Sequence, residues 1–241
     1  MIVIPMAGLS SRFFKAGYDI PKYMLPLGGK TVFAHAVESF QQYFDSERFV
    51  FIVRDVYDTP AFVEKQCRLL SIKDFEVITL DEETRGQAET VAKGIELASP
   101  YQGALTIFNI DTFRPGFEFP TKEKLEGGYL EVFKGSGSNW SFVKPQSPNS
   151  TRAIETAEKR AISDLCCTGL YHFGDISDYW AAYNHYLALP QEQWEKGELY
   201  VAPLYNHLIE KGHHVHYHLI DRAEVIFCGV PDEYQALLDQ Q

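Results

Sequence analysis

The chain has 241 residues, of which 45% are hydrophobic, 14% aromatic and 23% charged, a globular composition long enough for one large domain or two small ones. Its 22 basic and 33 acidic residues give a formal net charge of −11, which argues against general nucleic-acid binding, because that function needs a basic face. No apolar run approaches the roughly 18 residues of a membrane span, and the short first run lacks the basic flank of a signal peptide, so we expect a cytoplasmic protein without a membrane partner.

The cysteines indicate a reduced compartment. Cys67, Cys166, Cys167 and Cys228 show neither C-x-x-C spacing nor a disulfide framework. The vicinal pair lies in an apolar run, which favours a position in the core over redox chemistry.

The first half alternates buried-strand and helical patterns at short spacing. The apolar run that opens the chain predicts a strand, and Thr31 is a good N-cap for the helical run that follows it. The expected elements are strands over 2–6, 49–53, 75–80 and 104–110, with helices over 32–40, 60–70 and 87–99. This order predicts an α/β fold with a doubly wound, mostly parallel central sheet and right-handed crossovers.

After Asp111 the pattern changes to shorter strands between Gly, Ser, Pro and Asn turns. The expected elements are strands over 129–133, 139–144, 152–155, 165–173, 215–220 and 225–227, helices over 177–187 and 200–211, and a terminal helix from Pro231. No repeat and no separating linker is visible. We therefore predict a single domain over 1–241, with a regular half (1–111) and an elaborated half (112–241).

The loop after the first strand is cationic although the chain is acidic. Ala7-Gly8 allows a sharp turn and a close approach of the backbone to a ligand. The charged and hydroxyl residues that follow are Ser10, Ser11, Arg12, Lys15, Lys22 and Lys30, with Asp19 as the only acid. This composition favours an anionic ligand held by backbone N–H groups and fixed cations at the end of the strand.

Two other glycine-rich loops fit less well. A Rossmann fingerprint needs G-x-G-x-x-G, and the residue two places after Gly8 is Ser10. A P-loop ending in Gly29-Lys30-Thr31 would need its first glycine at Met24. We interpret Gly28-Gly29 as a plain turn before a helix.

The order strand, Gly8, Arg12, Pro21-Lys22, Leu25-Pro26-Leu27 resembles the signature loop of nucleotidyltransferases, which include sugar-phosphate nucleotidylyltransferases and small cytidylyltransferases. The resemblance implies a Rossmann-like three-layer α/β/α sandwich of the nucleotide-diphospho-sugar transferase (GT-A-like) type. It also implies that Arg12 meets the β- and γ-phosphates and Lys22 the α-phosphate. Backbone N–H groups would come from Ala7, Gly8, Leu9, Ser10 and Ser11. The alternative is a basic, solvated surface loop.

Ligands of doubly wound sheets lie beyond the carboxyl ends of the strands, so loops 8–22, 85–87 and 109–111 are expected to converge. Asp111 resembles the metal-binding Asp of the family, which would hold Mg²⁺ with the nucleotide phosphates; a turn cap is the alternative. The remaining nucleotide-binding residues implied by the resemblance are Gly86, Gln87 and Ala88, which could also be a simple helix start, and Asn109. Because Phe113 follows, the chain lacks the D-x-D of metal-dependent glycosyltransferases.

Other segments resemble the acceptor side of the family, so that half 1–111 would bind nucleotide and half 112–241 the acceptor. Phe142-Val143-Lys144-Pro145 resembles a Glu-Lys-Pro segment whose Lys meets the acceptor phosphate, but Val143 replaces the Glu. The resemblance implies catalytic roles for Arg12, Lys22 and Lys144, and acceptor binding by Asn139, Lys144, Thr168, Gly169 and Glu198.

The second metal ligand departs from the family pattern. Cys228-Gly229-Val230-Pro231 resembles a D-x-G-T-P ending, and the slot of its Asp falls at Phe227. Either Asp111 works with fewer protein ligands or another acid substitutes. We expect Asp232 to cap the terminal helix.

Asn139–Phe142 and Ile162–Tyr171 resemble capsule-locus nucleotidyltransferases, in particular CTP:phosphoglutamine cytidylyltransferases. This implies a Mg²⁺-dependent transferase that joins a nucleoside triphosphate, CTP by preference, to a small phosphorylated acceptor (phosphoglutamine-like or a sugar phosphate). Pyrophosphate would be released, and the product would serve capsular or cell-surface polysaccharide synthesis. No nucleic acid takes part, and a homodimer is compatible with the sequence. The alternatives are a sugar-1-phosphate uridylyl- or thymidylyltransferase, a nucleotide-binding regulator without turnover and, more distantly, a glycosyltransferase.

The run His213–His218 leads into the strand expected over 215–220, and strand alternation along it puts His214, His216 and His218 on one face. They could hold a metal ion or belong to an ordinary exposed strand face.

Overall fold

The computed structural model describes residues 1–240 and divides the chain into two compact units. The N-terminal unit comprises Ile2–Glu83, Phe108–Glu118 and the segment from Ala223 onward. The central unit comprises Met1, Thr84–Ile107 and Phe119–Arg222. One domain with halves 1–111 and 112–241 stays a prediction.

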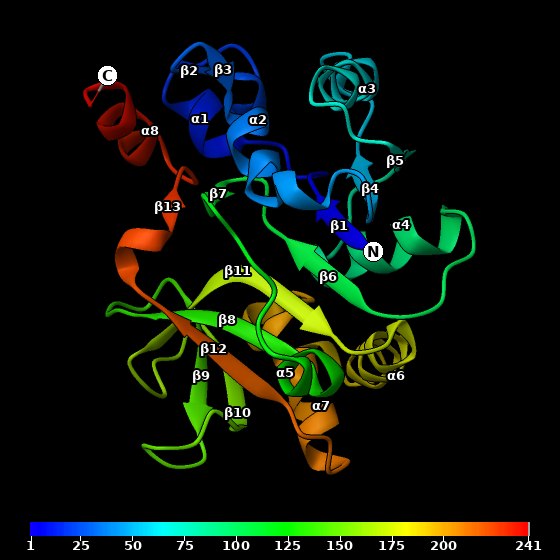
Figure 1. Ribbon diagram of the computed structural model, residues 1–241, viewed down its shortest axis with the longest axis vertical. Helices are drawn as coiled ribbons and strands as arrows, with labels where there is room; N and C mark the ends of the chain where they lie inside the picture. Colours follow the sequence, from blue (N-terminus) through cyan, green and yellow to red (C-terminus); the bar gives the residue numbers. More distant parts are fainter. Residues whose placement is uncertain (241) are drawn as a thin grey trace. The chain divides into compact units, whose positions relative to one another are not determined.

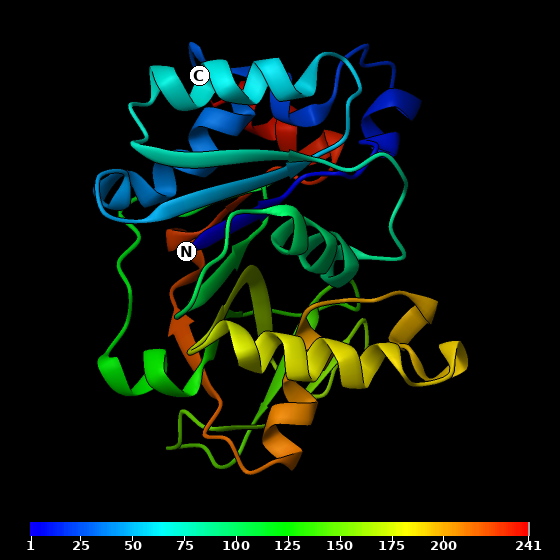
Figure 2. The same ribbon diagram turned by 90° about the vertical axis from the view of Figure 1, so that its right-hand side faces the viewer.

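The N-terminal unit contains a parallel sheet. Strand β4 (Arg48–Val53) pairs with β1 (Ile2–Pro5) on one side and with β5 (Asp74–Thr79) on the other, both in parallel. All four residues of β1 are buried, as expected for a continuous apolar run in a sheet covered on both faces. Helix α3 (Thr59–Leu69) lies alongside β4 and β5 (Figure 2). These strands and this helix lie where the sequence predicted them.

The turn before α2 (Val32–Val37) follows the predicted chemistry. Gly28 and Gly29 have φ of 54° and 79°, in the left-handed region that a residue with a Cβ rarely adopts. The Thr31 hydroxyl accepts a hydrogen bond from the Ala34 N–H at 3.1 Å and so caps α2. The turn is closed by a short hairpin of β2 (Pro26–Leu27) and β3 (Lys30–Thr31).

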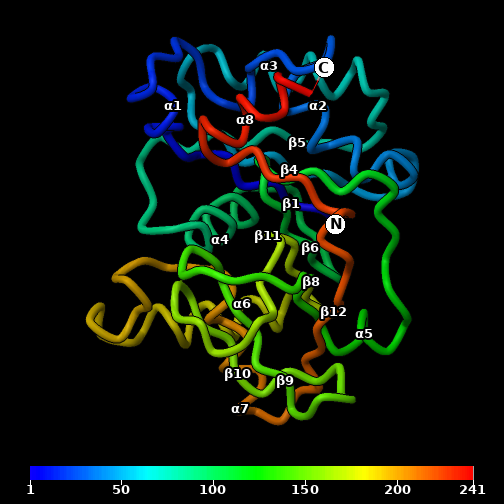
Figure 3. The backbone as a smooth tube through the Cα atoms, turned by 90° about the vertical axis from the view of Figure 1, so that its left-hand side faces the viewer, coloured from blue at the N-terminus to red at the C-terminus, as the bar shows by residue number. Residues whose placement is uncertain are grey.

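The C-terminal segment belongs to the N-terminal unit (Figure 3). Strand β13 (Ile226–Phe227) pairs antiparallel with β7 (Thr112–Phe113). Helix α8 (Pro231–Leu238) follows, and the Tyr234 hydroxyl donates to the Pro26 carbonyl at 2.6 Å. The last helix therefore braces the segment that follows the signature loop.

The central unit is built mainly from antiparallel strands. Strand β11, buried along its whole length, spans the range that the sequence predicted (Figure 1). It pairs antiparallel with β8 and β9, and β9 with β10, whereas β12 pairs with β8 in parallel. The helices of this unit are α4 (Gln87–Leu97), α5 (Lys122–Gly127), α6 (Ile176–Leu187) and α7 (Tyr205–Glu210). Its strands are β8 (Tyr129–Lys134), β9 (Ser141–Pro145), β10 (Ala153–Glu158), β11 (Leu165–Phe173), β12 (His216–Ile220) and β6 (Leu105–Phe108), of which the last residue, Phe108, is assigned to the N-terminal unit.

The helix predicted over 200–211 begins late. A 3₁₀ turn occupies Ala202–Leu204, and α7 starts at Tyr205. Pro203 explains the delay, because its ring fixes φ and removes one N–H donor, which suits a helix start and not a helix interior. Among residues 1–240, no helix is long and apolar enough to cross a membrane.

All four cysteines are free and buried, so the predicted core position of the vicinal pair is confirmed. Burial raises the thiol pKa of Cys67 and Cys228 to about 12 and that of Cys166 to about 11. The thiols are therefore protonated and inert at neutral pH.

Candidate active site

The signature loop turns at a different residue from the one expected. Ser10, and not Gly8, has left-handed backbone angles, with φ 50° and ψ 28°. A short helix, α1 (Ser11–Lys15), follows where the sequence predicted only a loop. No atom lies within 4 Å of the position where a Cβ on Gly8 would stand, so the backbone there is open to a close approach. Arg12 on α1 is exposed.

Two predicted site residues far apart in the sequence meet in the N-terminal unit. The Lys22 Nζ lies 2.5 Å from the Asp111 Oδ2, and the two side chains are 18% and 25% exposed. The backbone N–H of Lys22 also donates to the Ser10 hydroxyl at 3.2 Å, which ties the far end of the loop to its turn. The loops after β1 and β6 therefore converge as predicted. Gln87 lies in the central unit, so its part in this convergence stays a prediction.

An oxygen-lined niche lies next to Asp111. A Cβ on Gly229 would stand 3.1 Å from the Asp111 Oδ2 and 3.7 Å from the Glu233 Oε2, so this glycine keeps space open between two carboxylates. Oxygen donors of this kind suit Mg²⁺, and the residues present therefore fit that ion. Glu233, and not Asp232, reaches back to the start of α8: its Oε2 accepts from the Gly229 N–H at 2.8 Å.

A cleft of about 390 Å³ lies beside the signature loop in the same unit. Its walls are largely apolar, and the rings of Phe14 and Tyr57 stack there at a centroid distance of 5.4 Å. The other lining residues are Gly8, Leu9, Ser11, Lys15, Pro21, Tyr23 and Val56.

The Gly86 segment of the central unit is held by a distant loop. The Ala88 N–H donates to the Leu199 carbonyl at 2.8 Å, and the Leu199 N–H donates to the Arg85 carbonyl at 2.9 Å. Gly86 has φ 148°, and a Cβ there would stand 2.5 Å from the Leu199 carbonyl oxygen. Only glycine fits this contact. Glu198 is therefore the sequence neighbour of Leu199, which packs on the segment predicted to bind the nucleotide.

Arg85 and Glu89, which the sequence reasoning did not select, brace the same segment. The Arg85 Nη2 donates to the Glu89 Oε1 at 2.5 Å, and the guanidinium carbon lies 5.4 Å from the ring centroid of Trp194. Burial raises the pKa of Glu89, but the hydrogen bonds from Arg85 outweigh it and lower the pKa overall. Glu89 therefore stays ionised and anchors the start of α4.

The predicted acceptor residues do not form one cluster. Lys144 is 49% exposed, and its Nζ lies 3.5 Å from Glu155 on the neighbouring strand. Asn139 is exposed in the turn before β9. The Thr168 hydroxyl points inward and donates to the buried Glu131 at 3.0 Å. Gly169 has φ 97° and lies where the register of β11 shifts.

A polar cluster that the sequence reasoning missed lies at the end of β10. The Ser141 hydroxyl donates to Glu158 and lies 3.3 Å from the Tyr171 hydroxyl. Lys159 has left-handed backbone with φ 53°, and its Nζ bonds the Tyr200 hydroxyl and lies 4.5 Å from the centroid of that ring. Burial raises the pKa of Glu158, and the acids Glu195 and Glu198 add to this effect, against the opposing effects of Ser141 and Lys159.

One pattern in the sequence could have identified this cluster. Glu158-Lys159 has the Glu-Lys order that Val143-Lys144 lacks, and it precedes the same Thr168–Tyr171 strand. The Pro after Lys144 matches the Glu-Lys-Pro pattern and favours the earlier segment. In Glu158-Lys159-Arg160 an arginine follows the lysine instead.

The three histidines His214, His216 and His218 do not form an exposed strand face. His216 is buried, with its Nδ1 3.0 Å from the Thr151 hydroxyl, and His218 is half-buried with its Nδ1 3.2 Å from the Lys124 Nζ. His214 precedes β12 and is exposed. Within residues 1–240 these three do not form a metal-binding group.

Comparison with known proteins identifies the fold and the family. The chain matches a nucleoside-diphosphate-sugar pyrophosphorylase from Vibrio cholerae RC9 with 60% identity and a TM-score of 0.97 over 100% of both chains. It also matches an inositol-1-phosphate CTP transferase from T. maritima (16% identity, 98% of this chain and 94% of that one, TM-score 0.73). A UDP-glucose pyrophosphorylase in complex with UDP-glucose matches with 14% identity over 99% and 97% of the two chains, at a TM-score of 0.75.

No protein-family model matches the chain, and no curated protein sequence matches it. The two distant likenesses show the fold: a mostly parallel central sheet flanked by helices, of the Rossmann-like α/β type, as the sequence predicted. The similarity at 60% identity over the full length shows the family as well as the fold. The chain therefore belongs to the nucleotidyltransferase family and is an enzyme of that family.

Proposed function

We propose that the enzyme is Mg²⁺-dependent and condenses a nucleoside triphosphate, CTP by preference, with a small phosphorylated acceptor. A phosphate oxygen of the acceptor attacks the α-phosphorus, and a new P–O bond forms. The bond between the α-phosphorus and the oxygen bridging to the β-phosphate breaks, and pyrophosphate leaves. The product would serve capsular or cell-surface polysaccharide synthesis in the cytoplasm.

The contact between Lys22 and Asp111 carries this proposal. Nucleotidyl transfer depends on positioning the phosphates and on neutralising charge that shifts toward the leaving group. The lysine that contacts the α-phosphate and the carboxylate that holds the metal act on the same phosphate. Their side chains must therefore lie close together. The 2.5 Å contact brings this pair together, and the loop that carries Lys22 would also offer Arg12 to the β- and γ-phosphates. On nucleotide binding, Lys22 would exchange the Asp111 oxygen for a phosphate oxygen.

Asp111 would hold Mg²⁺. Phe227 stands where the family has its second metal-binding Asp, and Glu233 would take over the role of that Asp. The support is the niche at Gly229, which both carboxylates approach. When bound, Mg²⁺ would neutralise negative charge on the triphosphate. The backbone N–H groups of the loop around Gly8 would bind the same phosphates. Gly86, Gln87 and Asn109 remain the proposed nucleotide ligands that complete the set.

Lys159, in place of Lys144, would meet the acceptor phosphate. Its support is the partly buried cluster with Glu158 and Tyr200, whereas Lys144 is exposed and paired with Glu155. The Glu158 carboxylate would accept hydrogen bonds from hydroxyl or amide groups of the acceptor. The acceptor is therefore a small molecule that carries both a phosphate and a hydrogen-bond donor.

Two acceptor classes meet this description. Phosphoglutamine offers an amide-linked phosphate, as the resemblance to capsule-locus cytidylyltransferases implies. A sugar-1-phosphate is favoured by Glu158, which restores the acid missing at Val143, and by the likeness to a nucleoside-diphosphate-sugar pyrophosphorylase. The second candidate function is therefore that of a sugar-1-phosphate nucleotidylyltransferase.

The deciding experiment measures pyrophosphate release with CTP, UTP, dTTP, ATP or GTP and Mg²⁺ against phosphoglutamine, phosphocholine and hexose-1-phosphates. Release with CTP and phosphoglutamine supports the first candidate. Release only with a hexose-1-phosphate supports the second and refutes the first. Nucleotide binding without release from any pair would contradict both and favour a regulator.

A further inference from the structure

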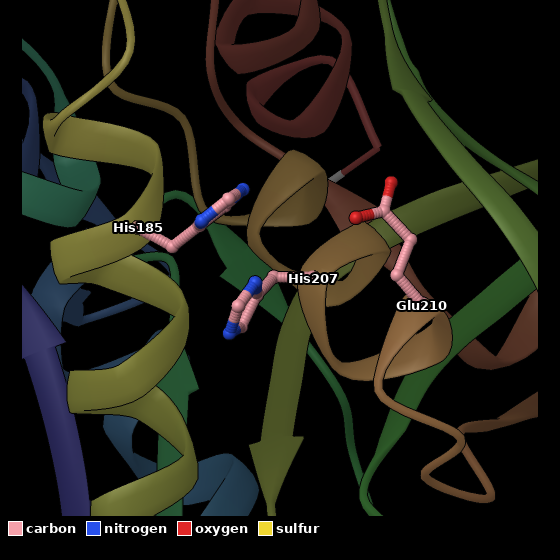
Figure 4. A group of neighbouring side chains, drawn as sticks. All are labelled: His185, His207 and Glu210. Carbon is pink, nitrogen blue, oxygen red and sulfur yellow. The ribbon is translucent and has the colours of Figure 1, made fainter.

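Two histidines and a glutamate meet where α6 packs on α7 in the central unit (Figure 4). His185 comes from α6, and His207 and Glu210 come from α7, three residues apart and so on the same face of the helix. A ring nitrogen of each histidine and a carboxylate oxygen of Glu210 all lie within 4.8 Å of one another. The two imidazole rings stack at a centroid distance of 4.2 Å. In the part of the chain that the structure describes, no other group of three such side chains comes this close.

We propose that His185, His207 and Glu210 bind a divalent transition-metal ion, Zn²⁺ above all. Two imidazole nitrogens and one carboxylate oxygen are the donor set of three-ligand zinc sites that keep a fourth position open. Mg²⁺ and Ca²⁺ prefer oxygen ligands throughout, so this site differs in chemistry from the niche at Asp111. Tetrahedral zinc with bonds of about 2.0–2.1 Å holds its ligand atoms about 3.3–3.5 Å apart. Imidazole lone pairs lie in the plane of the ring, so the exposed His185 ring would turn out of its stack on His207 to face the ion. The exposed Glu210 side chain would rotate toward the same point.

The composition of the group suits a cation. Each imidazole in its neutral form has one ring nitrogen with a lone pair that can bind a metal. The Glu210 carboxylate supplies negative charge that partly neutralises the ion.

The ion would join two helices that support the active site. The Tyr179 hydroxyl of α6 donates to the Ala88 carbonyl at 2.5 Å. The Asn206 side chain of α7 accepts from the Thr156 N–H at 2.8 Å and donates to the Thr156 carbonyl at 2.9 Å, which fastens α7 to β10. A metal between His185 and His207 would thus clamp the supports of the Gly86 segment and of Glu158. Its expected effect is on stability, with no part in the chemistry.

The test is calorimetric titration of Zn²⁺ into the enzyme in excess Mg²⁺, together with thermal unfolding and the visible absorption of bound Co²⁺. His185→Gln and Glu210→Gln should each weaken Zn²⁺ binding by at least about tenfold and abolish the Zn²⁺-dependent rise in Tm, because each removes one of three ligands. His214→Gln, an exposed histidine outside the group, is the matched control and should bind like the unaltered enzyme. Asp111→Asn should also retain the Zn²⁺ site, which separates that site from the proposed Mg²⁺ ligand.

Each outcome decides the proposal. A single Zn²⁺ lost in His185→Gln and kept in Asp111→Asn supports it. No Zn²⁺ binding by the unaltered enzyme, or equal dissociation constants for the unaltered enzyme and His185→Gln, overturns it. Zn²⁺ binding that disappears only in Asp111→Asn assigns the ion to the active-site niche and also overturns it. None of these readouts depends on turnover, so the outcome is independent of the proposed reaction.

Discussion

Lys22 is the single residue on which the proposed transfer depends most. Lys22→Ala should lower kcat by about 100-fold or more, because it removes a fixed cation aimed at charge that develops at the α-phosphate. Lys22→Arg keeps the charge but not its position, and should lose less. The assay is pyrophosphate release under saturating substrates, with circular dichroism to show that the fold is intact. Turnover near normal in Lys22→Ala would remove this lysine from the mechanism.

Lys144 and Lys159 form a matched pair for the acceptor side. Lys159→Ala should raise the KM for the acceptor by about tenfold, because a charge-assisted hydrogen bond to its phosphate is lost. Lys144→Ala removes an exposed lysine of equal charge and should change the KM little. The reverse pattern in steady-state kinetics would restore Lys144 to the role that the sequence predicted and refute the reassignment.

His172 gives the stability a pH dependence. Its Nδ1 lies 2.8 Å from the Thr106 hydroxyl inside the central unit, and burial lowers its pKa from 6.5 to about 4. Between these two pH values the unfolded chain binds a proton that the folded chain does not, so stability is full above pH 6.5 and falls as the pH drops toward 4. The loss should be on the order of 3 kcal/mol.

Urea unfolding from pH 7.5 to pH 4 measures this dependence. His172→Gln lowers stability at every pH through lost packing, but it should flatten the slope between pH 6.5 and 4. Parallel curves for the two proteins would show that His172 is not the group responsible.

At the scale of elements, the contact of Gly86 with Leu199 sets the start of α4. Gly86→Ala should destabilise the protein by about 2–4 kcal/mol, because it combines an unfavourable φ with a Cβ that overlaps a carbonyl oxygen. Gly212→Ala is the control: Gly212 also has positive φ, at 85°, but no atom lies within 4 Å of its Cβ position. Equal losses for the two variants in denaturant unfolding would mean that the Leu199 contact costs nothing.

The elements that the sequence predicted well have patterns that repeat along many residues. Strand β11 and helix α3 carry long apolar runs or helical spacing, and hydrophobic periodicity locates them closely. The short helices α1 and α5 were missed, because one or two turns contain too few apolar positions to define a period. Their existence is decided by surrounding packing, as when Phe13 of α1 is buried against Tyr18 and Tyr234.

The proximity of Lys22 and Asp111 could be predicted from the sequence, because a cationic loop and a strand-end acid both lie at carboxyl ends of strands. Their roles stay predictions. Glu158 and Lys159 share a Glu-Lys order that the sequence does show, but the burial of Glu158 and the left-handed backbone of Lys159, which set them apart from other Glu-Lys pairs, cannot be read from residue types. The contact of Glu233 with Gly229 is local to the start of α8, but only the fold brings Gly229 to Asp111.

At the scale of the whole molecule, nucleotide binding should appear as thermal stabilisation. A triphosphate with Mg²⁺ at 100 times its Kd adds about 2.7 kcal/mol, which corresponds to about 5–10 °C in Tm for a chain of this size. Asp111→Asn should lose most of the shift. Scanning calorimetry also tests the predicted single domain, since one cooperative transition is expected and two separate transitions would contradict it.

Because its native cysteines are buried, the enzyme can be labelled with a fluorescent dye at one introduced cysteine. All four native thiols are covered, so a maleimide dye at neutral pH would find few thiolates to react with. A single cysteine placed at an exposed position such as Leu219 would then be labelled selectively, without prior removal of the native ones. Fluorescence from that site would report on the surroundings of β12, in a protein whose interior is otherwise unaltered.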